Sequence, residues 1–202
     1  MRLTTGLGDF PHDAAAASGR VFVGAEGETS VSVLERGRTI RRLSVARQPG
    51  GIAPADGGRA IAVVSVRERV LELFDAVSLR RLAAEPAGVG PTHVVADGER
   101  VYVVDTTGEA VLVFRLRPRL QLTRRVTLHG SPYGIAIDRR RERLWVTLTR
   151  SNRVAALATG GRARLLRRLS TVRQPNTVAV DERSGRVFVA GRSAGVLQLL
   201  DP

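Results

Sequence analysis

Short runs of alternating apolar and polar residues, separated by turn residues, follow one another along the chain. In the best-defined stretch, one run spans residues 134–138, a polar turn follows, and the next spans residues 144–148. Arg150-Ser151-Asn152 leads to a third run at residues 154–157, and a fourth spans residues 165–169. Turn residues at this spacing favour β-strands over helices. The pattern therefore predicts an all-β protein.

This group of four runs recurs five times. Each copy opens with a proline, and the five prolines are 38, 42, 41 and 43 residues apart: Pro11, Pro49, Pro91, Pro132 and Pro175. A period of about 40 residues with four strands is typical of one blade of a β-propeller. We therefore predict a five-bladed β-propeller of four-stranded antiparallel blades, forming one domain over residues 1–202.

The blade boundaries follow from the prolines. The fifth copy ends after its third strand, whereas residues 2–8 resemble the fourth strand at residues 38–44. We therefore expect the N-terminal strand to pair into the last blade and close the ring, which would remove an open sheet edge. The predicted blades span residues 11–48, 49–90, 91–131, 132–174, and 175–202 together with 1–9.

One column of large residues is expected in the second strand of each repeat. It consists of Phe22, Ile61, Tyr102, Trp145 and Phe188. These side chains either stack on a ligand or fill the space between neighbouring blades. We favour packing, because large rings dominate the energetics of protein cores.

Several segments resemble a known group of repeats. Residues 132–138 (PYGIAID) and 151–154 (SNRV) resemble the YVTN-type β-propeller repeat, as do residues 11–13 and 175–181, and residues 101–105 (VYVVD) are similar to the NHL type. The resemblance covers the whole chain and implies a propeller, although such propellers usually have six or seven blades. These families include binding scaffolds, surface proteins and a few enzymes, such as streptogramin lyases and lactonases, so the resemblance leaves the activity open.

The chain is strongly basic, with 32 basic and 19 acidic residues and a net charge of +13, and all its basic residues are arginine. Arginine without lysine is typical of a GC-rich genome, so we interpret the charge as codon bias and solubility; the alternative is attraction to an acidic polymer or membrane surface. The absence of cysteine excludes disulfides and thiolate metal sites. Without a signal peptide or membrane span, we expect a soluble cytoplasmic protein; a start upstream of Met1 would leave room for an export leader.

Polar residues follow the repeat prolines, at the expected mouth of the central channel. They are either ligands for a small polar molecule or simply residues that cap strand ends beside water. Because two histidines of this set lie two blades apart without a third strong ligand, we predict no metal and no cofactor. The candidates are His12, Asp13, Thr92, His93, Tyr133 and Asn176.

Arginines form two further features. Arg67, Arg150 and Arg192 lie in loops expected at the same mouth, where they could clamp a carboxylate or a phosphate. Arginine pairs on the fourth strands would form an outer collar that deters edge-to-edge pairing, or else binds phosphate backbones. The pairs are Arg41-Arg42, Arg80-Arg81, Arg124-Arg125 and Arg167-Arg168.

The sequence has no H-E-x-x-H motif and no phosphate-cradling loop. Asp97, Asp138 and Asp181 recur at turns and are expected to form those turns. We therefore predict a non-enzymatic binding scaffold whose channel mouth takes a protein or a small polar or anionic ligand. Two alternatives stay open. One is a propeller lyase or hydrolase with His12 or His93 as base, and the other is a polyanion or nucleic-acid binder that uses the arginine collar.

Overall fold

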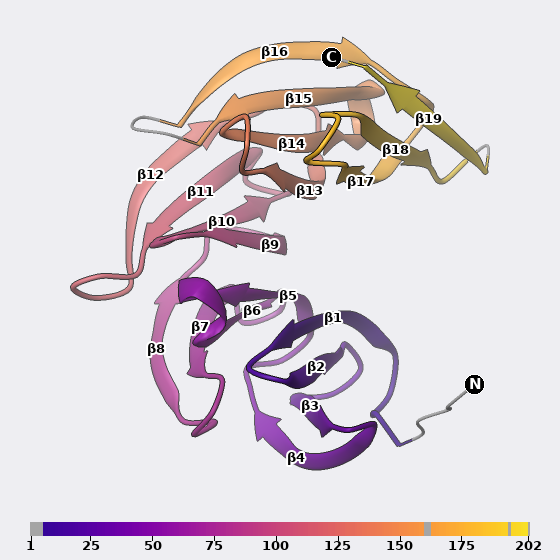
Figure 1. Ribbon diagram of the computed structural model, residues 1–202. Coiled ribbons are helices and arrows are strands. Elements are labelled where there is room, and N and C mark those ends of the chain that lie inside the picture. The colour runs from indigo at the N-terminus through magenta and orange to yellow at the C-terminus, as the bar shows by residue number, and fades with distance from the viewer. Residues whose placement is uncertain (1–5, 160–162, 194, 202) are drawn as a thin grey trace.

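The computed structural model describes residues 6–159, 163–193 and 195–201, and these form β-strands joined by short turns (Figure 1). Two short 3-10 turns, η1 (Asp56–Gly58) and η2 (Thr149–Ser151), are the only helical elements in the described ranges. None of the helical elements described is long and apolar enough to cross a membrane. The prediction of an all-β protein is confirmed.

The strands described here form five antiparallel sheets, in chain order. Sheet 1 contains β1 (Pro11–Ala17), β2 (Arg20–Ala25), β3 (Ser30–Glu35) and β4 (Arg38–Ser44). Sheet 2 contains β5 (Pro49–Ala55), β6 (Ala60–Ser65), β7 (Val70–Asp75) and β8 (Arg81–Pro86). Sheet 3 contains β9 (Pro91–Asp97), β10 (Arg100–Asp105), β11 (Ala110–Arg115) and β12 (Gln121–Thr127). Sheet 4 contains β13 (Pro132–Asp138), β14 (Arg143–Leu148), β15 (Arg153–Ala158) and β16 (Arg164–Ser170), and sheet 5 contains β17 (Pro175–Val180), β18 (Val187–Gly191) and β19 (Val196–Leu200).

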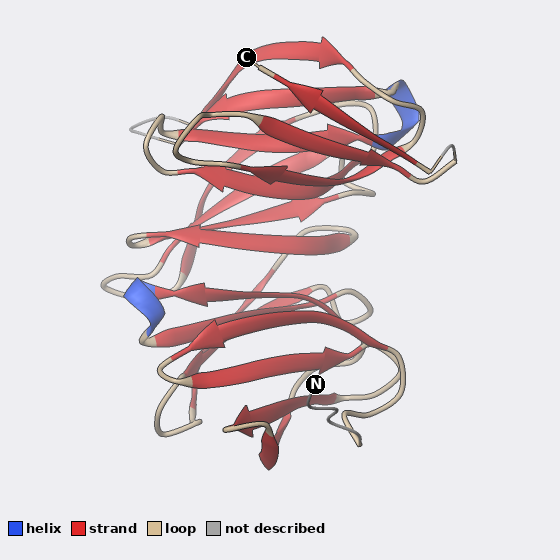
Figure 2. Cartoon of the chain, turned by 45° about the vertical axis from the view of Figure 1, so that its right-hand side comes forward, coloured by secondary structure: helices blue, strands red, loops and turns tan. Residues whose placement is uncertain are grey.

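The sheets follow one another along an arc (Figures 1 and 2). Each first strand begins at a repeat proline, as the sequence predicts, and neighbouring first strands contact one another: β1 with β5, β5 with β9, β9 with β13 and β13 with β17. The first strands therefore line the inside of the arc. The fourth strands lie outside, and β4 and β12 are exposed along most of their length.

Apolar side chains from adjacent sheets form the core, in four clusters between sheets. Strand residues alternate between two faces. We call the face toward the following sheet the forward face and the face toward the preceding sheet the backward face. Phe22, Tyr102 and Trp145 occupy one column of the forward face and are at most 1% exposed. The packing role predicted for this column is confirmed for these three side chains.

In sheet 2, the predicted column is wrong by one residue. Ala62 occupies the column, because it lies opposite Ala53, just as Phe22 lies opposite Ala15. Ile61 lies on the backward face and packs against sheet 1. A shift of one residue moves a strand side chain to the other face. Ile61 is bulkier than Ala62, so in the sequence it resembles the large residues of the column more closely.

The N-terminal segment does not pair with sheet 5 over its described residues. Instead, residues 6–10 contact sheet 1: Ser32 donates to the carbonyl oxygen of Leu7 at 3.1 Å, and Arg42 donates to that of Gly6 at 2.8 Å. Sheet 5 has three strands among the described residues, and it lies at the opposite end of the arc from sheet 1 (Figures 1 and 2). The closure predicted for residues 1–9 is therefore wrong for residues 6–9. Residues 1–5 of that prediction lie outside the described residues.

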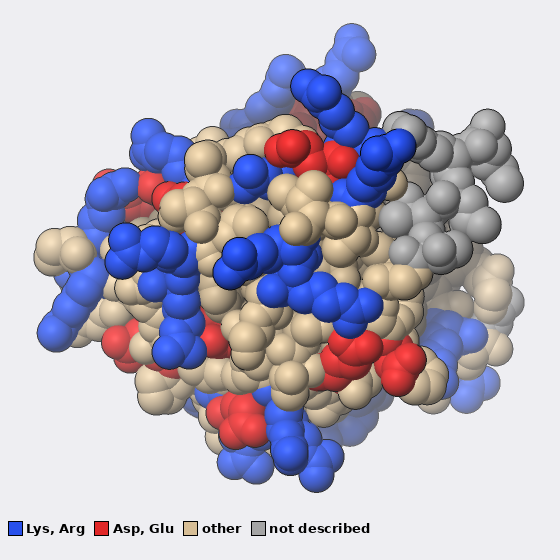
Figure 3. All heavy atoms as spheres, turned by 90° about the horizontal axis from the view of Figure 1, so that it is seen from below, with Lys and Arg blue, Asp and Glu red and all other residues tan. Residues whose placement is uncertain are grey.

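The arginine pairs of the outer strands are partly engaged within the fold. On the face seen in Figure 3, basic side chains alternate with acidic ones and form no single patch. One arginine of each pair contacts its own sheet, through an ion pair, a backbone carbonyl or an aromatic ring: Arg42 with Glu28, Arg81 with Glu72, Arg125 with Gly108 and Arg167 with Trp145. These contacts give the pairs a role in holding the outer strands. The edge-protecting and phosphate-binding interpretations stay predictions.

Replacement of Trp145 tests the packing between sheets. Trp145→Ala should lower the free energy of unfolding by about 3–5 kcal/mol, because it empties a fully buried site between sheets 4 and 5. Trp145→Phe should cost much less, because the indole nitrogen has no hydrogen-bond partner that would be lost. Urea denaturation measures both. Equal stability of the alanine variant and the wild type would contradict the packing role.

Candidate functional site

Two histidines and a tyrosine form a row along the inside of the arc. The ring centres of His12 and His93 are 5.8 Å apart, and those of His93 and Tyr133 are 4.6 Å apart in an edge-on arrangement. The residues come from sheets 1, 3 and 4, so the row crosses the first strand of sheet 2. The two histidines do lie two sheets apart in the chain order, yet their rings are neighbours.

Glycine in β5 permits this approach. A β-carbon at Gly51 would lie 2.9 Å from both the α-carbon of His93 and the carbonyl oxygen of Thr92, which is closer than real β-carbons come. The Nδ1 atom of His12 lies 2.8 Å from the carbonyl oxygen of Gly50. A carbonyl only accepts, so Nδ1 of the neutral ring carries the hydrogen and Nε2 remains an acceptor.

His93 is the buried member of the row. Burial lowers its pKa below the ordinary value of 6.5; the nearby charge of Asp13 opposes this shift, and His12 adds to it. The Nδ1 atom of His93 is buried without a hydrogen-bond partner among the described residues. The imidazole of His93 is therefore neutral at pH 7 and contributes an aromatic surface to the row.

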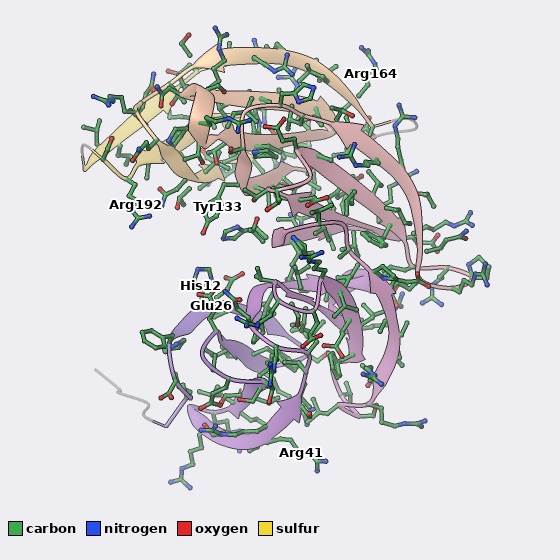
Figure 4. The ribbon with its side chains drawn as sticks, turned by 180° about the vertical axis from the view of Figure 1, so that it is seen from behind. His12, Glu26, Arg41, Tyr133, Arg164 and Arg192 are labelled. Atoms are coloured by element: carbon green, nitrogen blue, oxygen red, sulfur yellow. The ribbon has the colours of Figure 1, made fainter. Side chains whose placement is uncertain are left out.

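A cavity of about 310 Å³ adjoins Tyr133 and extends across sheets 3, 4 and 5. The residues that line it carry hydroxyl, amide and guanidinium groups: Thr106, Ser131, Tyr133, Thr149, Gln174, Asn176 and Arg192. Figure 4 shows Tyr133 and Arg192 pointing into the open space inside the arc, toward the side on which His12 and Glu26 lie. The cavity therefore brings together three of the predicted site residues, Tyr133, Asn176 and Arg192.

The repeat explains why Arg192 points into this space. The residue directly after the second strand occupies the same position in every repeat. In sheets 3 and 4, this residue forms a hydrogen bond to the next sheet. Thr106 donates to the carbonyl oxygen of Pro132 at 2.6 Å, and Thr149 donates to that of Pro175 at 2.7 Å. Arg192 holds this position in sheet 5, where no further sheet follows among the described residues. Its guanidinium makes no hydrogen bond or ion pair with any described residue.

The other candidates have structural contacts. Asp13 accepts hydrogen bonds from the backbone of Ile52 at 2.9 Å and of Ala14 at 2.8 Å, so it joins sheets 1 and 2. The hydroxyl of Thr92 lies 2.9 Å from that of Thr106. These contacts give Asp13 and Thr92 structural roles in the wall of the arc.

The three predicted clamp arginines do not meet. Arg67 lines a separate depression of about 650 Å³ between sheets 1 and 2, with Arg47, Glu26 and Glu28 among its other lining residues. Arg150 forms an ion pair with Glu109. Of the three, only Arg192 lines the cavity beside Tyr133.

Sequence reasoning missed the hydroxyl and amide groups that complete this cavity. Ser131 and Gln174 directly precede repeat prolines, and Thr106 and Thr149 directly follow second strands. Comparison of these two repeat positions across all five copies would have revealed them. Within the described ranges, no group of three or more histidine, aspartate or glutamate side chains is placed to hold a metal ion.

Comparisons with known proteins give the fold. No protein-family model and no curated protein matches the sequence. A functionally unknown protein from Desulfotomaculum acetoxidans matches with a TM-score of 0.78 at 12% identity, over 94% of this chain and 69% of that chain. Virginiamycin B lyase from Staphylococcus aureus matches with 0.76 at 11% identity, over 94% and 69% of the two chains. A streptogramin B lyase structure matches with 0.75 at 10% identity, over 94% and 65%.

These identities show the fold alone, and that fold is a β-propeller. The chain spans between 65% and 69% of the length of these three structures. Its function therefore has to be argued from its own residues.

The protonation of His93 predicts a pH dependence of stability. The pKa of His93 is lowered by folding, so the unfolded chain binds this proton more tightly than the folded chain does. Its contribution to stability is thus present above pH 6.5 and is lost as the pH falls below that value. His93→Phe keeps an aromatic ring beside Tyr133 and removes the proton site.

Between pH 7 and pH 5, the free energy of unfolding of the wild type should fall more steeply than that of His93→Phe. The difference in slope is limited to about 1.4 kcal/mol per pH unit for one group. Urea denaturation at several pH values measures it, and parallel curves for the two proteins above pH 7.5 serve as the control. Parallel curves below pH 6.5 as well would contradict the burial of a neutral His93.

Proposed function

We propose that this protein is a non-enzymatic binding scaffold that holds a small, polar anionic ligand at the mouth of a propeller-type channel. In this proposal the five sheets are five blades, with repeats of the YVTN or NHL kind, and the protein acts in the cytoplasm. The binding site is the cavity between sheets 3, 4 and 5. The observation that carries the proposal is the unpaired guanidinium of Arg192 at the edge of this cavity.

The lining favours an anion. A guanidinium presents a planar fork of donors that matches a carboxylate or a phosphate. Tyr133, Asn176 and Gln174 add donors that can bind further ligand oxygens. No acidic side chain lines the cavity among the described residues. The net charge of +13 also raises the local concentration of anions.

The size of the cavity limits the ligand. A volume of about 310 Å³ lies at the lower end of the range for small-molecule sites. A mono- or dicarboxylate or a small phosphate ester fits this volume. The walls are strands held by hydrogen bonds between sheets, so little conformational entropy is lost when a ligand binds.

Replacement of Arg192 tests the proposal. A panel of small dicarboxylates, inorganic phosphate and phosphate esters is screened by thermal shift, and affinity for any hit is measured by calorimetry. Arg192→Gln should weaken binding about tenfold or more, because a hydrogen bond to a charged group contributes roughly 1.5–3 kcal/mol. Arg164→Gln, on the outer strand β16, is the matched control and should leave the affinity unchanged. Equal losses in both variants would indicate a general charge effect and would overturn the proposed site.

His12 gives a second candidate function, that of a lyase or hydrolase. Its Nδ1 atom is fixed on the carbonyl oxygen of Gly50, which leaves Nε2 as a free acceptor on the inside of the arc. Such a nitrogen is suited to general-base catalysis. If a bound compound is converted, His12→Gln should abolish the conversion and preserve binding. If the compound remains unchanged with the wild type as well as with His12→Gln, only the scaffold function is supported.

A further inference from the structure

The two ends of the arc expose complementary apolar faces. Each of the four contacts between consecutive sheets has the same design, in which the forward face of one sheet packs on the backward face of the next. Sheet 5 therefore has a forward face without a following sheet among the described residues, and sheet 1 has a backward face without a preceding one. The ends of the arc are well separated in both views (Figures 1 and 2).

The forward face of sheet 5 is uncovered. Leu197 and Leu199 are 57% and 51% exposed, whereas Val154 and Ala156, at the equivalent positions of sheet 4, are 0% and 1% exposed. Phe188 stands in the same column as Trp145 and is only partly buried. These side chains have the apolar character of a contact between sheets, but no described sheet contacts them.

The backward face of sheet 1 is also open at one end. Val21 is 41% exposed, whereas the residues at its position in the other four sheets are 0% exposed: Ile61, Val101, Leu144 and Val187. Ala14 and Ala16 on the same face are exposed as well. Residues 6–7 contact sheet 1 at Ser32 and Arg42. Leu34, opposite Val21 on the same face, is only 8% exposed, so the open part of this face is Val21 with the adjoining residues of β1.

We propose that a second copy of this chain covers these faces, with the forward face of sheet 5 in one copy packed against the backward face of sheet 1 in the next. The occupant follows from the repeat, because each exposed face is one half of a contact that the chain makes four times within itself. This head-to-tail contact joins two different surfaces, so it leaves one free face at each end of a dimer and permits further addition. The observations behind this proposal are the exposed faces, and ligand binding at Arg192 is not among them.

Two single variants and their mixture test it. Leu199→Glu places a charge on the forward face of sheet 5, and Val21→Glu places one on the backward face of sheet 1. The wild type should show a molar mass that rises with concentration in light scattering or sedimentation. Each variant alone should be monomeric, because every possible contact then includes one altered face. An equimolar mixture should form a dimer, since each variant keeps the face that the other requires.

The controls separate this assembly from misfolding and from nonspecific association. Both altered residues are substantially exposed, so circular dichroism and the unfolding midpoint should match those of the wild type. Val77→Glu changes an exposed apolar residue outside both faces and should assemble like the wild type. A wild type that is monomeric at all concentrations overturns the proposal. So does a mixture that remains monomeric. A single variant that still dimerises would also overturn it, because it would point to a contact between two identical faces.

Discussion

The structure depends on apolar packing between consecutive sheets. Each interior sheet is covered on both faces, so its second strand reads as a nearly unbroken apolar run; in β6 all six residues are buried. A single four-stranded sheet with two apolar faces cannot bury them alone, and each neighbour removes one face from water. The large rings of Phe22, Tyr102 and Trp145 fill the same position in three of the four contacts between sheets, and Ala62 holds it in the fourth.

This packing also decides where the polar groups of the mouth lie. The first strands approach so closely that a β-carbon at Gly134 would lie 2.6 Å from the carbonyl oxygen of Asn176. The same closeness at Gly51 lets His12 and His93 meet across sheet 2. The threonines that bond to the next repeat proline then hold the sheets in place. The cavity beside Tyr133 is thus a product of the contacts between sheets, which are determined far from the cavity itself.

Arg192 shows how one repeat position can acquire different roles. Thr106 and Thr149 use it to link neighbouring sheets, and in sheet 1 it is Glu26, which accepts a hydrogen bond from Gln48 at 3.0 Å. In sheet 5, where the described residues provide no following sheet, a charged side chain at this position faces the interior of the arc. The end of the arc therefore supplies both the unpaired charge of the candidate site and the uncovered apolar face of sheet 5.

The sequence by itself determined the repeat, the strands and most of their alternation, because turn residues and apolar spacing are local properties. It also placed Tyr133, Asn176 and Arg192 at one end of their strands, since the repeat prolines mark where each first strand begins. It could not settle the register at Ile61 and Ala62, because a bulky neighbour one position away gives the same local pattern.

Only the tertiary structure decided which polar residues meet. His12 and His93 are 81 positions apart and come together because glycine lies between them. The three arginines do not form the expected clamp, because Glu109 engages Arg150 and Arg67 lines a separate depression. The position of residues 6–9 on sheet 1 was likewise decided by contacts with Ser32 and Arg42 that no local pattern encodes. Such contacts depend on distances between sheets, which are fixed by the packing of many side chains at once.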